Sequence, residues 1–164
     1  MNLRRRLLMG KAGVAYEAWD LSFDASEYTY IDTGVYLFTQ DNLNKDFEII
    51  IDNLYAPSGQ TRIKTMVCAK DNVSSSGFLI RPTGDTETAY KGTIAMKAAY
   101  YNHITVRRIG GVLSAIGEVI TNPGFAFKNE SHEYPLILGC SFDDNGNRTR
   151  YITGTIGHIV VRWL

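Results

Sequence analysis

The chain has 164 residues, a length that fits one domain and allows a sizeable core. Its composition is 45% hydrophobic and 21% charged, which is typical of a globular protein and excludes a disordered one. The 17 basic and 17 acidic residues cancel, so no global field directs the chain toward nucleic acid, and no apolar run approaches the roughly 20 residues of a membrane helix.

The first residues differ from the rest of the chain. Arginines at positions 4–6 precede Leu7, Leu8 and Met9, and the apolar stretch ends there. A secretory signal has roughly 7–15 apolar residues, so we expect no signal peptide. We expect that residues 1–19 form a basic arm. This arm either stays unstructured or forms a short helix that docks on a protein partner or a second copy of the chain.

From Asp20 onward, short runs with a period of two predict strands. In chain order these are residues 28–32, 35–38, 47–54, 61–71, 77–82, 92–100, 103–109, 112–120, 134–142 and 153–164. Gly110-Gly111 and Asn145-Gly146 each predict a tight hairpin turn, because both dipeptides tolerate positive φ. Regularly spaced strands with intervening turns favour two packed sheets, as in a sandwich or jelly roll.

The two cysteines, Cys68 and Cys140, each lie in an apolar run. This setting favours buried free thiols, although the sequence leaves a disulfide between them open. No CxxC pair and no Cys/His spacing typical of a metal site is present.

Four segments resemble laminin-G-like domains of the concanavalin A-like lectin/glucanase superfamily and follow one another in the family's order. They are LSFDASEYTYIDTGVYL (21–37), FEIIIDN (47–53), YNHITVRRIGGVLSAIGEV (101–119) and PLILGCSFDDNGNRTRYITGTIGHIVVRWL (135–164). The resemblance covers residues 20–164. It implies an all-β jelly-roll sandwich of two antiparallel sheets, one convex and one concave, that follows the arm.

The same resemblance implies that sugars or proteins bind on the concave face or at the loops along its rim. Stand-alone domains with a short Arg-rich start also resemble small structural proteins of phages and prophages. That likeness favours a virion or an extracellular surface as the location.

Catalysis is the next question, because some members of the superfamily are glucanases. A retaining glucanase needs two carboxylates on one face of a strand, across the scissile bond. Glu48 and Asp52 share a face, but isoleucines 49–51 fill the gap and no third acid follows. We therefore expect a non-catalytic protein. The alternative is a glycoside hydrolase-like enzyme of the same fold with an atypical active site.

One cluster of acids and amides suits a metal ion. Calcium takes six to eight oxygen ligands, and many domains of the resembling fold hold it in loops. The best candidate ligands are Asp143, Asp144, Asn145 and Asn147. The same residues also suit a plain turn, in which Asx side chains bond to nearby backbone groups.

Sugar binding requires an exposed aromatic ring beside hydrogen-bonding groups. The candidate ligand-binding residues are Tyr100, Tyr101, Asn102, His103 and Tyr90, and Trp19 is a further aromatic candidate. A strand histidine such as His103 is more often packed or placed at an edge than catalytic, and in the resembling family this position is largely structural.

The sequence thus leaves two main hypotheses for a non-catalytic module. One is recognition of a carbohydrate or another cell-surface polymer. The other is assembly of a phage or prophage particle, with the basic arm as the docking element.

Overall fold

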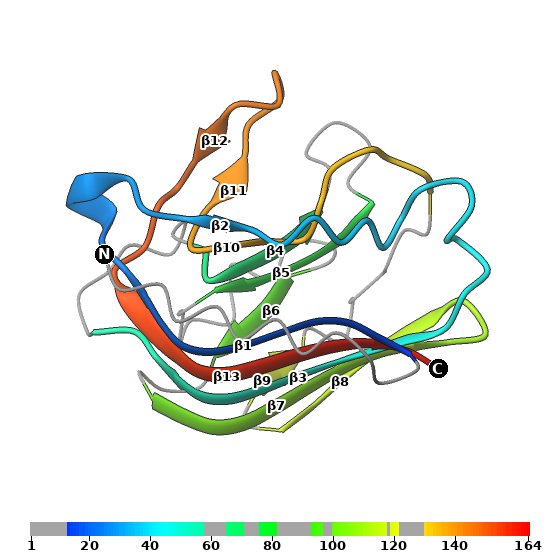
Figure 1. Ribbon diagram of the computed structural model, residues 1–164, viewed down its shortest axis with the longest axis horizontal. Helices are drawn as coiled ribbons and strands as arrows, with labels where there is room; N and C mark the ends of the chain where they lie inside the picture. The colour runs from blue at the N-terminus through cyan, green and yellow to red at the C-terminus, as the bar shows by residue number, and fades with distance from the viewer. Residues whose placement is uncertain are drawn as a thin grey trace.

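Two β-sheets lie face to face in the computed structural model, which confirms the predicted all-β sandwich (Figure 1). The structure describes residues 13–57, 65–70, 76–81, 93–96, 100–117, 119–121 and 130–164. Within these ranges, the side chains of residues 93–96, 100–102, 117 and 119–121 are not described. In the part of the chain that is described, no helix is long and apolar enough to span a membrane.

The first sheet has five antiparallel strands and contains the beginning and the end of the described chain. In spatial order these are β1 (Val14–Phe23), β13 (Gly154–Trp163), β3 (Phe47–Tyr55), β7 (Tyr100–Ile109) and β8 (Val112–Gly117). This sheet curves around the core (Figure 1).

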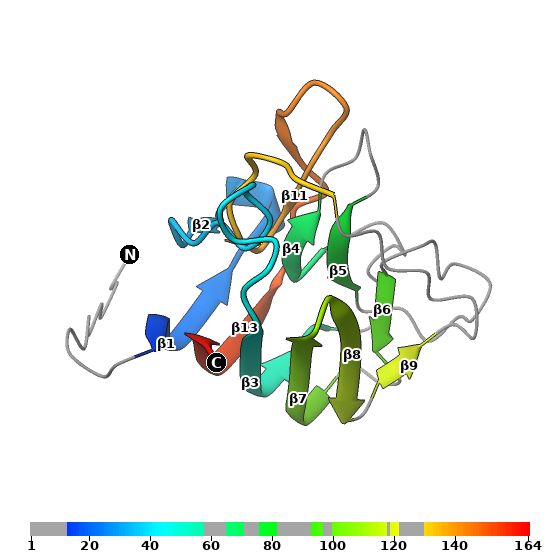
Figure 2. The ribbon, with the colours of Figure 1, turned by 90° about the vertical axis from the view of Figure 1, so that its right-hand side faces the viewer.

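The second sheet has six shorter strands. In spatial order these are β2 (Ile31–Asp32), β10 (Ile137–Leu138), β4 (Val67–Lys70), β5 (Gly77–Arg81), β6 (Thr93–Met96) and β9 (Val119–Thr121). Its neighbouring strands are antiparallel except β5 and β6, which run parallel. A separate hairpin of β11 (Ser141–Phe142) and β12 (Arg148–Thr149) projects beside this sheet, as Figure 2 also shows. One short 3-10 helix, η1 (Ala25–Glu27), lies between β1 and β2.

The core forms because strand side chains alternate between two faces. On β3, Phe47, Ile49 and Ile51 are fully buried between the sheets. The alternate residues Glu48 and Asp52 therefore lie on the outer face of the five-stranded sheet, which is where the polar residues of its central strands gather.

A bend crosses the five-stranded sheet at one level. Asp20 on β1 and Asn53 on β3 have positive φ angles of 54° and 53°. Gly157 on β13 lies between them, and a Cβ atom there would lie 2.8 Å from Cβ of Asn53. Aspartate and asparagine are the non-glycine residues that best tolerate this backbone region. The backbone is therefore irregular at this level of the sheet, immediately beside the polar row described below.

Both predicted hairpins are confirmed. Gly110 and Gly111 have φ angles of 56° and 79° and join β7 to β8. In the second hairpin, Gly146 has a φ of 78°, and its N–H donates to the Asp143 carbonyl at 3.0 Å.

Several sequence-based expectations are wrong in detail. Of the strand predicted over residues 28–32, only residues 31–32 form a strand, β2. Residues 35–38 are not a strand: this segment is irregular, with Leu37 and Phe38 buried. The predicted strand over residues 134–142 is divided into β10 and β11 at Gly139. The domain also begins earlier than Asp20, because residues 14–19 belong to β1 and pair with β13 along an antiparallel ladder. The rest of the predicted basic arm, residues 1–12, lies outside the described residues.

The two cysteines are buried free thiols, as the apolar runs around them favour. Burial raises the pKa of Cys68 to about 11 and that of Cys140 to about 12. Both thiols are therefore protonated at neutral pH. They pack with Leu79, Ile137 and Phe142 in a second apolar cluster on the six-stranded sheet.

The break at Gly139 yields a stability prediction. Its φ is +87°, and a Cβ atom there would overlap the ring of Phe23. Gly34 also has a positive φ, +69°, but its Cβ position is open. We expect Gly34→Ala to lower the free energy of unfolding by about 1 kcal/mol, and Gly139→Ala by roughly 1–3 kcal/mol more, as measured by urea denaturation. Equal losses for the two variants would contradict the close packing of Gly139.

Candidate ligand-binding face

The outer face of the five-stranded sheet carries a transverse row of aromatic and polar side chains. The strand pairings place Trp19 opposite His158, His158 opposite Asp52, and Asp52 opposite His103. The row therefore crosses β1, β13, β3 and β7. Neighbouring strands lie about 4.8 Å apart, so the row is about 14 Å long. We call these four residues the Trp19 row.

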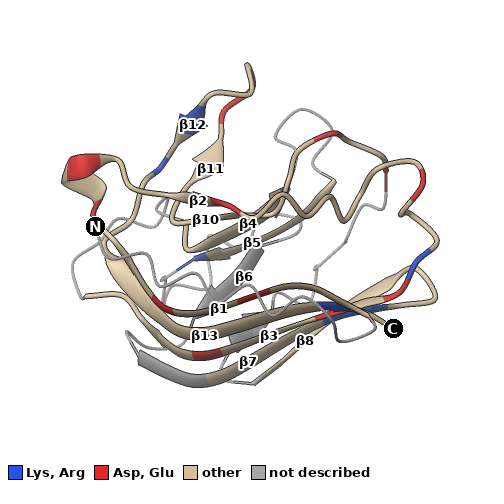
Figure 3. Cartoon of the chain, viewed as in Figure 1, with Lys and Arg blue, Asp and Glu red and all other residues tan. Residues whose placement is uncertain are grey.

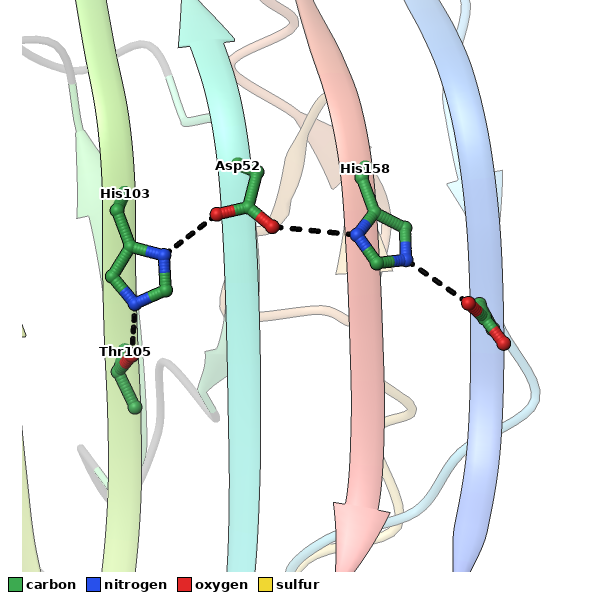
Figure 4. A network of polar contacts seen from close by, with 5 residues as sticks. Asp52, His103, Thr105 and His158 are labelled. Carbon is green, nitrogen blue, oxygen red and sulfur yellow. Dashed lines mark hydrogen bonds and ion pairs between the residues drawn. The ribbon is translucent and has the colours of Figure 1, made fainter. Parts of the chain in front are cut away.

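A continuous chain of polar contacts connects the row (Figure 4). The two carboxylate oxygens of Asp52 contact different imidazoles, at 2.6 Å from Nδ1 of His103 and 3.3 Å from Nδ1 of His158. The other nitrogen of His103 lies 2.8 Å from the Thr105 hydroxyl, and that of His158 lies 3.1 Å from a carboxylate oxygen of Glu17. Asp52 thus holds both rings in place.

All four imidazole nitrogens therefore have protein partners. A histidine that ligates a metal or acts as a general base needs one ring nitrogen directed at the metal or the substrate. Neither His103 nor His158 offers one without breaking a contact. The network therefore acts first as a means of orienting side chains on the sheet face.

The side chain that this network orients is Trp19. Its indole lies flat on the imidazole of His158, with ring centroids 3.6 Å apart and an interplanar angle of 15°. Trp19 remains 45% exposed. Because one ring face is covered by His158, the exposed area is at the ring edges and the opposite face. The row thus presents an oriented aromatic surface beside two partly exposed carboxylates, Asp52 and Glu17.

Thr105, His103 and Asp52 have the same connectivity as a hydroxyl–imidazole–carboxylate triad. A nucleophile must reach its substrate, however, and Thr105 is only 6% exposed in the middle of a sheet face. The geometry suits a hydroxyl that fixes the orientation of His103.

A second charged group lies further along the same face. The carboxylate of Glu48 is 2% exposed and lies between Arg107 on β7 and Arg162 on β13, whose side chains are 46% and 45% exposed. Arg162 Nε donates to Glu48 at 2.8 Å, and Arg107 donates to the other carboxylate oxygen. In Figure 3, basic and acidic positions lie side by side near the end of β13. The two guanidinium groups hold the pKa of Glu48 below its ordinary range although burial acts to raise it.

The predicted ligand-binding residues have different outcomes. His103 lies in the row. Tyr100, Tyr101 and Asn102 belong to β7, but their side chains are not described, and Tyr90 lies outside the described residues. Binding by these residues stays a prediction.

Sequence reasoning missed Glu17, Asp52 and His158 as members of the network that contains His103. A period-two pattern in EIIID and GHIVV does place Asp52 and His158 opposite the buried isoleucines. The pairing of strands far apart in sequence, which brings these side chains together, is not visible in that pattern.

The predicted calcium ligands lie at the tip of the β11–β12 hairpin. One carboxylate oxygen of Asp143 accepts hydrogen bonds from the N–H groups of Asn145 at 2.9 Å and Asn147 at 2.8 Å. These bonds, that of Asn147 first, lower the pKa of Asp143. Among the side chains that the structure describes, no three His, Cys, Asp or Glu residues are grouped to hold a metal. The geometry is that of a local turn. Calcium binding by Asp143, Asp144, Asn145 and Asn147 stays a prediction.

Comparison with known proteins identifies similar folds but no family. No family model and no curated protein matches the chain. Among solved structures, it is similar to NanB sialidase from Streptococcus pneumoniae in complex with 2-[(3-chlorobenzyl)ammonio]ethanesulfonate, with a TM-score of 0.51 and 11% identity. A mutant of the same sialidase gives a TM-score of 0.50 and 11% identity.

Each of these alignments covers 91% of this chain and 26% of the sialidase chain. The chain thus spans about a quarter of the length of the sialidase that it matches. At this identity the similarity shows the fold alone, a β-sandwich.

Proposed function

We propose that this chain is a non-catalytic carbohydrate-binding module and that the Trp19 row is its binding surface. The observation that carries the proposal is the exposed indole of Trp19, held flat on His158 by a network that leaves the neighbouring carboxylates of Asp52 and Glu17 partly accessible. The similarity in fold to one part of a sialidase supports a carbohydrate-related role.

The chemistry of the row suits a sugar. A pyranose ring has an apolar face of C–H groups that stacks on an aromatic ring, and hydroxyl groups at its edge that hydrogen-bond to carboxylates. Trp19 supplies the first kind of contact, and Asp52 and Glu17 supply the second. The row's length of about 14 Å suits a short oligosaccharide lying across the strands.

The proposed role is binding without hydrolysis. Glycoside hydrolysis needs one carboxyl group that donates a proton and a second that acts as nucleophile or base. Here the Asp52 carboxylate contacts two imidazoles, and Glu17 contacts one of them. The alternative of an atypical hydrolase has no observation in its favour among the described residues. The assembly hypothesis depends on residues 1–12, which the structure does not describe.

A glycan array followed by calorimetry tests the proposal. We expect the intact chain to bind a defined group of oligosaccharides, and Trp19→Ala to weaken that binding at least tenfold because the stacking surface is removed. Ile116→Ala is the matched control, since Ile116 is an apolar residue on β8 of the same face and is 54% exposed, compared with 45% for Trp19. No specific binding on the array would sink the proposed function. Equal loss in both variants would sink the assignment of the site to Trp19.

A further inference from the structure

A second aromatic cluster lies away from the Trp19 row, at the edge of the six-stranded sheet. It joins two segments far apart in sequence: Tyr28 and Tyr30 before and beside β2, and Tyr151 after β12. In Figure 1 these segments lie on the side of the molecule opposite the outer face of the five-stranded sheet. We infer that this cluster, with Arg148 and Asp32, is a second binding site, for uncharged glycans. This inference rests on the proposed function that the chain binds carbohydrate.

Tyr28 is the most exposed of the three tyrosines and is held in an unfavourable conformation. It is 67% exposed and has φ 54° and ψ 37° at the end of η1. A helix end with this backbone geometry usually has glycine or asparagine, and a bulky side chain there strains the backbone. Tyrosine therefore occupies this position against the backbone preference, and its ring contacts Tyr151.

The backbone that carries Tyr28 is fixed by several hydrogen bonds. The Asp24 carboxylate accepts from the Ser26 N–H at 2.8 Å and from its hydroxyl at 2.7 Å. The Ala25 N–H donates to the Thr153 hydroxyl at 3.2 Å, which ties the turn to the segment before β13. The ring of Tyr28 is thus presented from a defined position.

The three rings form one surface because Tyr151 anchors the other two. The ring of Tyr28 meets that of Tyr151 edge to face at 5.2 Å, and Tyr30 lies 6.3 Å from Tyr151. Tyr151 packs in turn against the apolar cluster of Cys68, Leu79, Ile137, Cys140 and Phe142. Tyr28 and Tyr30 remain exposed on a rigid base, which suits stacking with the apolar face of a sugar.

Polar groups suited to hydroxyls lie beside the rings. The guanidinium of Arg148 lies 4.5 Å from the ring centre of Tyr30, and its terminal nitrogen lies 3.5 Å from an Asp32 carboxylate oxygen. Both side chains are more than a third exposed. A planar donor group next to a planar acceptor can bond to two adjacent sugar hydroxyls.

The charges indicate which glycans fit. Arg148 and Asp32 are paired, so their charges cancel, and Glu27 and Asp24 lie nearby in the turn. The site thus has no excess positive charge to compensate an acidic sugar. We therefore assign it to uncharged glycans, in contrast to carboxylated ones.

Two variants test the site. Tyr28→Gly removes the ring at a backbone conformation that glycine prefers, so the fold is retained, and thermal melting verifies this. The matched control is Tyr36→Ala, an exposed tyrosine outside the cluster. The probes are the neutral trisaccharides cellotriose, maltotriose and triacetylchitotriose, with sialyllactose as the acidic probe.

The measurement is an NMR titration that follows each site separately, through the Trp19 indole N–H and through amides of residues 28–32 and 148–151. We expect a neutral trisaccharide to shift the second group. We expect Tyr28→Gly to weaken this response at least tenfold, while Tyr36→Ala leaves it unchanged and Trp19→Ala retains it. Shifts at Trp19 alone would overturn this inference and leave the proposed function intact. No shift at either site would overturn both. A stronger response to sialyllactose, or a response to a peptide only, would overturn the assigned ligand class.

Discussion

Replacing Arg108 with methionine is expected to lower the free energy of unfolding by about 3–5 kcal/mol. Arg108 is fully buried on the inner face of β7. Its guanidinium donates to the backbone carbonyls of Asn42 at 2.6 Å, Lys45 at 2.6 Å and Leu37 at 3.2 Å. These carbonyls belong to the irregular segment before β3 and are not paired in a β-sheet. The Arg108 side chain is a hydrogen-bond donor for all three.

Aromatic rings complete the environment of this arginine. The guanidinium carbon lies 5.1 Å from the ring centre of Phe38 and 4.7 Å from that of Phe47. Methionine retains much of the apolar stem but removes the guanidinium donor from all three carbonyls, of which that of Asn42 still accepts from the Lys45 N–H at 3.0 Å. The loss therefore results from unsatisfied buried acceptors more than from a cavity.

The adjacent arginine provides a matched control. Arg107 occupies the next position on β7, points to the outer face and is half exposed. Arg107→Met should lower the free energy of unfolding by about 1–2 kcal/mol, less than Arg108→Met, because Arg107 is half exposed and the buried Glu48 carboxylate keeps Arg162 as its partner. Urea denaturation of both variants at neutral pH gives the comparison. Similar losses in the two variants would show that the buried contacts of Arg108 do not have the energetic role assigned to them.

The two arginines illustrate what the sequence can predict. Alternation along HITVRRI places Arg107 and Arg108 on opposite faces, and the Gly110-Gly111 turn fixes the hairpin that they precede. The pattern does not say which arginine faces inward. That depends on the irregular segment at residues 37–45, which begins inside the strand predicted over residues 35–38. Its carbonyls accept hydrogen bonds from Arg108.

The candidate site depends even more on long-range pairing. The sequence places Trp19, a further aromatic candidate, at the end of the predicted arm, yet it pairs with His158, which is 139 positions later. His103 was identified from its own neighbours in sequence, but its partner Asp52 comes from another strand. A pattern along one strand predicts which side of the sheet a residue occupies. The residues beside it depend on the order and register of the strands, and these were not predicted residue by residue.

The second large effect concerns Glu48, whose carboxylate is shared by Arg107 and Arg162. At pH 7 we expect Glu48→Gln to lower the free energy of unfolding by about 2–4 kcal/mol, since hydrogen bonds to charged groups contribute more than neutral ones. Glutamine has the same shape, so the loss reports the charge. Glu27→Gln, on the exposed turn η1, is the control and should have little effect.

The pH dependence gives this prediction a defined sign. The folded state lowers the pKa of Glu48 relative to the unfolded chain, where a glutamate titrates near about 4.3. The stabilisation is therefore fully present above that pH and is lost as the pH falls through the lower folded-state pKa. Denaturation curves between neutral pH and about pH 2 should show the difference between the intact chain and Glu48→Gln shrinking with acidification. A difference that is the same at every pH would mean that the ionised carboxylate is not what joins β7, β3 and β13 at this point.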